Sequence, residues 1–154
     1  MYSNIFLDAD DTLLDFKKAQ LYGFKSVIEF YHFPFSDELY SRYERINHSL
    51  WKNFEEGVLT KDDVQNKRFA LLFNSMGIDI DGQEANSCYQ NSLKNQVWLV
   101  PYAEEVCKKL SEKCVLTIVT NGVGKTQYQR ISSSAISPFI TNLVVSEDIG
   151  IAKP

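Results

Sequence analysis

The wide spacing between the predicted strands is the feature that most constrains the fold of this chain. A short apolar strand is predicted at residues 4–8, and the next clear strand lies far along the chain at residues 115–120. The residues between them are mostly of helical pattern. After residue 120, a helix near residues 125–134 leads to a third predicted strand at residues 142–146. Strands separated by helices indicate a parallel sheet, so we predict an α/β fold.

The long helical stretch predicts an insertion of four helices into this α/β core. Ser36 and Thr60 are good N-caps for the second and third helices, and Gly57 and Gly77 are their expected stops. The predicted helices cover residues 16–31, 36–56, 60–77 and 82–96, and another follows at residues 102–111. We therefore predict a core of residues 1–15 with 98–154, and a helical cap of residues 16–97.

Composition narrows the classes of function. The chain has 154 residues, 44% of them hydrophobic, and a formal net charge of −4 with acidic and basic residues interspersed. Such a chain lacks the basic stripe that binds nucleic acid polymers. Three cysteines without CxxC spacing predict reduced thiols. No apolar run approaches the ~18 residues of a membrane span, and Asp8 interrupts any secretory h-region, so we predict a cytoplasmic protein without a membrane contact.

Chemically reactive residues follow the predicted strands. Asp8 and Asp10 end the first strand, Thr120-Asn121-Gly122 ends the second, and Lys153 follows the third. Ligands bind at the carboxyl ends of parallel strands, so these groups are candidates for one site. Crowded carboxylates resist burial unless a cation or a developing positive charge holds them. The alternatives are a turn with a helix N-cap for the aspartates, a plain turn for residues 120–122 and a surface charge for Lys153.

These residues resemble the three motifs of the haloacid dehalogenase-like (HAD) superfamily. The first is matched by Asp8-Ala9-Asp10-Asp11-Thr12-Leu13, the second by Thr120-Asn121-Gly122 and the third by Lys153-Pro154. The resemblance implies a Rossmann-like core with a helical cap. Residues 50–57 (LWKNFEEG) and Lys67-Arg68-Phe69 are further similar to bacterial YjjG-type pyrimidine 5′-nucleotidases.

The resemblance implies a Mg²⁺-dependent phosphomonoester hydrolase. Asp8 would attack phosphorus and form an aspartyl-phosphate, and Asp10 would protonate the leaving oxygen and then activate water. Asp8 and the main-chain carbonyl of Asp10 would be the metal ligands, since Mg²⁺ prefers oxygen donors. The phosphate-binding residues would be Thr120, Asn121, Gly122 and Lys153, with Thr120 and Lys153 also counted as catalytic.

The expected substrate is a small phosphomonoester, foremost a nucleoside 5′-monophosphate. Dehalogenase members lack the second aspartate, since a halide needs no proton, whereas a sugar alkoxide does. Three alternatives stay open: a sugar-phosphate phosphatase, a phosphomutase, and a catalytically silent fragment that acts as a binding module. Trp51, Phe54, Phe69 and Phe73 are predicted to pack within the cap, with stacking on a nucleobase as the alternative role.

The resemblance also implies a fourth motif, an acidic pair after a later strand, that completes the Mg²⁺ shell. No such pair follows Lys153 in these 154 residues. The predicted core is therefore incomplete at its C-terminal side, and activity of this chain alone stays open. An incomplete sheet leaves a strand edge unpaired, so we expect self-association or pairing with a complementing chain.

Overall fold

The structure is a computed structural model that describes residues 2–153. Its contacts divide the chain into two compact units. Unit 1 comprises residues 1–20 and 93–154, and unit 2 comprises residues 21–92. From the sequence, the helical unit was predicted to run from residue 16 to residue 97. The role of the helical unit as a cap over the site stays a prediction.

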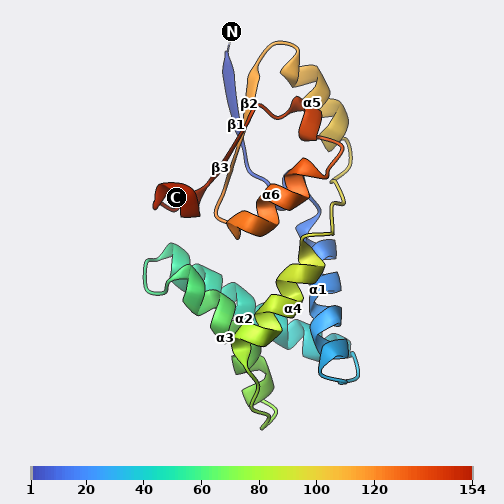
Figure 1. Cartoon of the computed structure of the whole chain (residues 1–154), viewed down its shortest axis with the longest axis vertical. Coiled ribbons are helices and arrows are strands. Elements are labelled where there is room, and N and C mark those ends of the chain that lie inside the picture. Colours follow the sequence, from blue (N-terminus) through green and yellow to red (C-terminus); the bar gives the residue numbers. More distant parts are fainter. Residues whose placement is uncertain (1, 154) are drawn as a thin grey trace. The chain divides into compact units, whose positions relative to one another are not determined.

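A parallel three-stranded sheet organises unit 1 (Figure 1). The strands are β1 (Asn4–Leu7), β2 (Val115–Thr120) and β3 (Asn142–Val145), in the order β1-β2-β3. Leu7 pairs with Ile118, and Thr120 pairs with Val145. The predicted α/β class and parallel sheet are confirmed. Because the strands are parallel, Asp8 and Thr120 come to the same edge of the sheet.

Helices α5 (Ala103–Ser111) and α6 (Gly124–Ser132) pack against β2 and β3, respectively (Figure 1). Leu116 and Ile118 of β2 are fully buried, and they join a core cluster with Cys107 of α5 and Ile131 of α6. Side chains two positions apart on a strand share a face, so Leu116 and Ile118 turn one face of the sheet toward these helices. Two short elements were not predicted, a 3₁₀ turn at Ser137–Phe139 and α7 (Ser146–Ile149).

Unit 2 is helical, and the four helices predicted for the insertion are confirmed, although residues 16–20 of the first and residue 93 of the fourth belong to unit 1. Ser36 caps α2 by accepting from the Leu39 amide at 3.1 Å, and Thr60 forms a capping box with Asp63 at the start of α3. The fourth helix ends at Leu93, three residues before the predicted end at 96. The bounds are α1 (Phe16–Phe30), α2 (Asp37–Glu55), α3 (Lys61–Asn74) and α4 (Gly82–Leu93).

Aromatic rings form the centre of unit 2. Tyr43 of α2 stacks on Phe69 of α3, with ring centroids 5.1 Å apart, and Tyr89 of α4 lies 5.4 Å from Phe69. All three side chains are fully buried. The buried Arg68 guanidinium lies 4.2 Å from the Tyr89 ring. The helical spacing of these residues therefore builds a core, as expected for amphipathic helices packed together.

The chain leaves and re-enters unit 1 through two segments that pair with each other. The Asp15 amide donates to the Trp98 carbonyl at 2.9 Å, and the Val100 amide donates to the Leu13 carbonyl at 3.0 Å. Leu14 and Leu99 form an antiparallel bridge between these bonds. The pairing holds both connections to the helical unit in one short ribbon.

Strand β1 lies at an edge of the sheet formed by residues 2–153, and its Phe6 side chain is 71% exposed. The expected self-association or pairing with a complementing chain stays a prediction. No helix within the described part of the chain is long and apolar enough to span a membrane.

Candidate active site

Asp8 follows β1 and carries one anchored and one open carboxylate oxygen. Its Oδ1 accepts hydrogen bonds from the Ala9 amide at 2.8 Å and from Lys153 Nζ. Its Oδ2 accepts none from residues 2–153, and the side chain is 44% exposed. One oxygen is therefore held in place while the other stays accessible to a ligand.

Lys153 is held at both its side chain and its backbone. Its Nζ also donates to the Val119 carbonyl at 3.2 Å. Its amide donates to Asn121 Oδ1 at 2.9 Å, and Asn121 Nδ2 donates to its carbonyl at 3.2 Å. The Asn121 side chain thus fixes the segment that carries the lysine. Pro154, the other residue of the third motif, lies outside the described residues.

Asp10 is bound through both carboxylate oxygens by two residues of α6. Arg130 Nη1 donates to Oδ1 at 2.6 Å, and Gln127 Nε2 donates to Oδ2 at 2.8 Å. Burial raises the pKa of Asp10, against the opposing charge and hydrogen bond of Arg130 and the hydrogen bond of Gln127. A carboxyl group with a raised pKa is better able to carry a proton near neutral pH, as a general acid requires.

Thr120 presents a hydroxyl group whose lone pairs are occupied. Its Oγ1 accepts from the Gly122 amide at 3.0 Å and from Gln127 Nε2 at 2.9 Å. A hydroxyl has one donor hydrogen and two acceptor lone pairs. The hydrogen is therefore the part of this group that can meet an acceptor such as a phosphoryl oxygen.

Asp11 caps the start of a helix, which is the structural role that the sequence analysis gave as the alternative for the aspartates. Its backbone is left-handed, with φ of 58°, and its Oδ1 accepts from the Phe16 and Lys17 amides at 3.1 and 3.3 Å. These amides begin α1 and have no partner within the helix.

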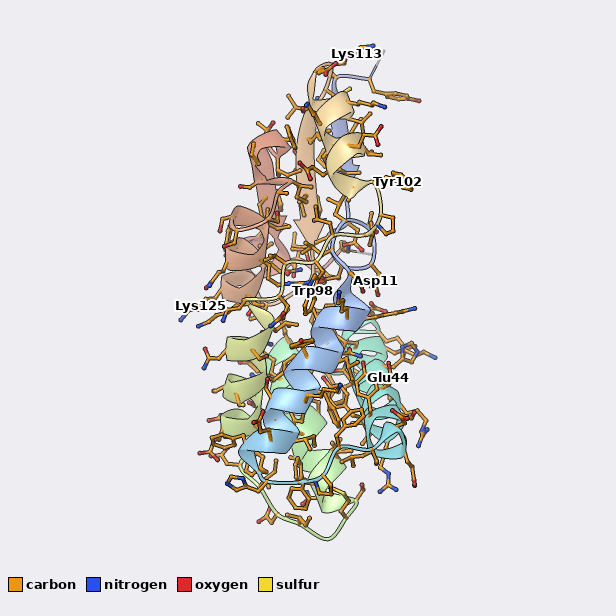
Figure 2. All side chains as sticks on the ribbon, turned by 90° about the vertical axis from the view of Figure 1, so that its right-hand side faces the viewer. Asp11, Glu44, Trp98, Tyr102, Lys113 and Lys125 are labelled. Carbon is orange, nitrogen blue, oxygen red and sulfur yellow. The ribbon has the colours of Figure 1, made fainter. Side chains whose placement is uncertain are left out.

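In Figure 2, Asp11 and Lys113 lie at opposite ends of unit 1, the first after β1 and the second before β2.

The structure brings the predicted residues together in two groups, each linked by its own hydrogen bonds. Asp8 meets Lys153, whose segment is held by Asn121, and Asp10 is joined to Thr120 through Gln127. The roles assigned to these residues stay predictions.

Sequence reasoning missed Gln127 and Arg130, which are 1% exposed each. They lie three positions apart, on one face of the helix that follows the second motif. Polar residues at such inward positions of a short amphipathic helix were the available signal, because buried polar groups need partners. Arg130 Nη2 is buried and has no hydrogen-bond partner among residues 2–153.

The donor atoms at this edge suit a hard cation in part. The open Asp8 Oδ2 is a carboxylate oxygen, and no thiol or imidazole takes part in the contacts of Asp8 and Asp10. Within residues 2–153, no cluster of three or more His, Cys, Asp or Glu side chains could hold a metal ion by itself. The residues therefore fit a Mg²⁺ that takes its other ligands from phosphate, water or further protein groups.

Comparison with known proteins places this chain in a family. The model of the family described as "Haloacid dehalogenase-like hydrolase" matches residues 5–154, and this range includes all three motifs. The chain belongs to this family. The family predicted from the strand-end motifs is therefore confirmed.

Curated relatives cover nearly the whole chain. YfnB from Bacillus subtilis is 37% identical over 153 residues, which are 99% of this chain and 65% of YfnB. The pyrimidine 5′-nucleotidase YjjG from Escherichia coli is 26% identical over 150 residues, 97% of this chain and 65% of YjjG. The pyrimidine 5′-nucleotidase PynA from Streptococcus pneumoniae is 28% identical over 154 residues, 99% of this chain and 65% of PynA. The chain thus spans about two thirds of the length of these relatives.

Solved structures share the fold. The magnesium-bound crystal structure of YfnB matches with a TM-score of 0.93 and 37% identity, over 99% of this chain and 67% of that one. The L-2-haloacid dehalogenase from Xanthobacter autotrophicus matches with a TM-score of 0.73 and 15% identity, over 100% and 60% of the two chains. The second likeness concerns the fold alone.

Proposed function

We propose that the protein is a Mg²⁺-dependent phosphomonoester hydrolase that acts through an aspartyl-phosphate on Asp8. The observation that carries the proposal is the ion pair between Lys153 Nζ and Asp8 Oδ1, which joins residues 145 positions apart at the carboxyl edge of the sheet. A phosphoryl group bound here would contact both a nucleophile, the open carboxylate oxygen of Asp8, and a cation, the ammonium group of Lys153.

In the first half of the proposed reaction, an Asp8 oxygen forms a bond to phosphorus and the ester bond to the leaving oxygen breaks. Asp10 transfers its proton to that oxygen, so that an alcohol departs rather than an alkoxide. The burial of Asp10, which raises the pKa of its carboxyl group, supports this role.

In the second half, the Asp10 carboxylate takes a proton from a water molecule that attacks phosphorus, and the bond to Asp8 breaks. Thr120 donates its remaining hydrogen to a phosphoryl oxygen, and Lys153 offsets the negative charge on these oxygens. Both donors are prearranged, since Thr120 is bound by Gln127 and the Lys153 backbone by Asn121.

Asp8 and the main-chain carbonyl of Asp10 would hold Mg²⁺. When bound, this ion neutralises charge on the phosphoryl oxygens and orients the phosphate. The magnesium in the YfnB structure supports this part of the proposal.

The proposed substrate class is a pyrimidine nucleoside 5′-monophosphate. Its support is the similarity to YjjG and PynA, both named as pyrimidine 5′-nucleotidases. Among the aromatic residues considered for base stacking, Phe69 and Phe73 are fully buried within unit 2. Trp51 and Phe54 are half-buried, with ring centroids 5.5 Å apart, and they are the candidates for contact with a base.

The test is phosphate release by the full-length protein from a panel of nucleoside monophosphates and sugar phosphates, with and without Mg²⁺. We expect Mg²⁺-dependent release that is highest for pyrimidine nucleotides and absent in Asp8→Asn. Full activity of Asp8→Asn would exclude the mechanism. An isomerised sugar phosphate would instead identify a mutase, and binding of phosphate without turnover would identify a silent binding module.

A second experiment tests the part played by the helical unit. Replacing residues 16–97 with the corresponding segment of another family member should change substrate preference, while turnover of p-nitrophenyl phosphate is retained. An unchanged preference would show that substrate choice lies in unit 1.

A further inference from the structure

Both oxygens of the Asp10 carboxylate are held from one helix. Arg130 reaches Oδ1 at 2.6 Å, and Gln127 reaches Oδ2 at 2.8 Å. The rotation of an aspartate carboxyl group about its last bond is broad when nothing holds it. Two donors from α6 on opposite oxygens remove that freedom.

The Gln127 amide has a defined orientation. Its Oε1 accepts from Arg130 Nη1 at 3.0 Å, while its Nε2 donates to Asp10 Oδ2 and to Thr120 Oγ1. Exchanging the amide oxygen and nitrogen would set donor against donor at Arg130 and acceptor against acceptor at Asp10. Gln127 therefore links Asp10, Thr120 and Arg130 into one hydrogen-bond network.

Arg130 is itself fixed by groups with no part in the proposed chemistry. Its Nε donates to the Gln96 carbonyl at 3.0 Å, and its guanidinium lies 5.7 Å from the Phe16 ring. Phe16 begins α1, and Gln96 lies in the segment that returns from the helical unit. The guanidinium is only 1% exposed, so these contacts leave it little freedom to move.

We infer that Gln127 and Arg130 are positioning residues that hold the Asp10 carboxyl group in the direction needed for proton transfer to the leaving oxygen. The inference rests on the proposed function, in which Asp10 is the acid and base. In that reaction the proton passes from Asp10 to the leaving oxygen and later from water to Asp10. Toward Asp10, Gln127 and Arg130 only donate hydrogen bonds, and they transfer no proton.

This role predicts a dependence on the leaving group. An alkoxide must be protonated as it departs, whereas p-nitrophenolate is stable without a proton. Misplacing the acid should therefore slow the first turnover of an alkyl phosphate by about 10²-fold, the lower range of what general acid catalysis contributes. The first turnover of p-nitrophenyl phosphate should change by less than about threefold on the same argument.

The experiment compares rapid-quench first-turnover rates of the full-length protein with uridine 5′-monophosphate and p-nitrophenyl phosphate. Gln127→Glu sets a carboxylate against Asp10 in nearly the same volume, and Arg130→Met removes the guanidinium. Arg130→Lys keeps the charge and should restore only part of the rate, because lysine cannot reproduce the planar fork of donors.

Two matched controls separate positioning from general damage. Gln129→Glu makes the same change on the same helix, where Gln129 donates to Asn95 at 3.2 Å. Arg68→Met removes a buried arginine of unit 2 that is 2% exposed. Neither control should change the ratio of the two first-turnover rates.

Equal slowing of both substrates, or no slowing of either, would overturn the inference while leaving the proposed hydrolase in place. If the unaltered protein hydrolyses neither substrate, the proposed function fails instead. Crystal structures of Gln127→Glu and Arg130→Met then still decide the structural part. A rotated Asp10 carboxyl group supports its positioning by α6, and an unchanged one contradicts it.

Discussion

The Asn121 side chain brackets the backbone of Lys153, accepting from its amide at 2.9 Å and donating to its carbonyl at 3.2 Å. The lysine that pairs with Asp8 is therefore held by a residue of the second motif. This contact couples two motifs that lie 32 residues apart.

Asn121→Asp should lower kcat/KM of the full-length protein about tenfold. Aspartate keeps the acceptor for the Lys153 amide but faces the Lys153 carbonyl with an oxygen, so one hydrogen bond is lost and a repulsion is added. Steady-state kinetics of Asn121→Asp, Lys153→Met and the double variant measure the coupling. The double variant should be no slower than Lys153→Met alone.

Additive losses would contradict an action of Asn121 through Lys153. Lys113→Met is the matched lysine control, since Lys113 is exposed and lies at the end of unit 1 opposite Asp11 (Figure 2). It should keep the activity of the unaltered protein.

Gly122→Ala should disturb Asp10 through Gln127. A Cβ at residue 122 would lie 2.6 Å from Gln127 Nε2 and 2.7 Å from Gln127 Cγ, so the side chain must move. We expect about a tenfold loss of kcat/KM, on the order of one hydrogen bond to a charged group. In a Gln127→Ala background, the same change should cost little more, because the obstructing side chain is gone. A full tenfold loss in that background would place the cause elsewhere.

Thr60→Ala should destabilise the helical unit by about 1 kcal/mol, the usual cost of losing an N-cap. Thr60 Oγ1 accepts from the Asp63 amide at 3.1 Å, and Asp63 Oδ2 accepts from the Thr60 amide at 3.0 Å. Urea denaturation followed by circular dichroism measures the change. Thr60→Ser keeps the hydroxyl and should recover most of the loss.

Asp63→Asn should lower stability at pH 7 and lose this effect in acid. The hydrogen bond from Lys67, followed by that from Thr60, holds the pKa of Asp63 well below its usual range. A lowered folded-state pKa contributes stability above the unfolded value of about 3.9, and that contribution disappears as the pH falls through the folded-state pKa. The difference in melting temperature between Asp63→Asn and the unaltered protein should therefore shrink below about pH 3.9.

Asp62→Asn is the control for this pH dependence. Asp62 lies in the same first turn and is exposed, and it takes no part in the capping box. A difference at Asp63 that stays constant from pH 7 into acid would contradict the assigned cause.

Gly82→Ala should destabilise unit 2 by about 1–3 kcal/mol, the usual cost of overpacking. An added Cβ would overlap the backbone carbonyl oxygen of Asn66, which cannot turn away as a flexible side chain can. Gln83→Ala, at the exposed neighbouring position, should stay within about 0.5 kcal/mol of the unaltered protein. Equal stability of the two variants would show that α4 shifts freely against α3.

Local signals in the sequence predicted most of the elements. The N-caps Ser36 and Thr60 act within one helical turn, so a few neighbouring residues suffice to place them. The fourth helix was predicted too long because the segment after Leu93 is engaged elsewhere. The Gln96 carbonyl accepts from Arg130, which is 34 positions away, so no residue near Gln96 indicates this contact.

The sequence by itself determined which groups come to the carboxyl edge, because parallel strands bring Asp8, Asp10 and Thr120 to the same side whatever their exact register. Only the tertiary structure decided how these groups are held. Asp10 meets Gln127 and Arg130 across 117 and 120 residues, and Lys153 meets Asp8 across 145. Contacts of that separation depend on strand pairing and on how α6 packs, and no pattern of neighbouring residues encodes them.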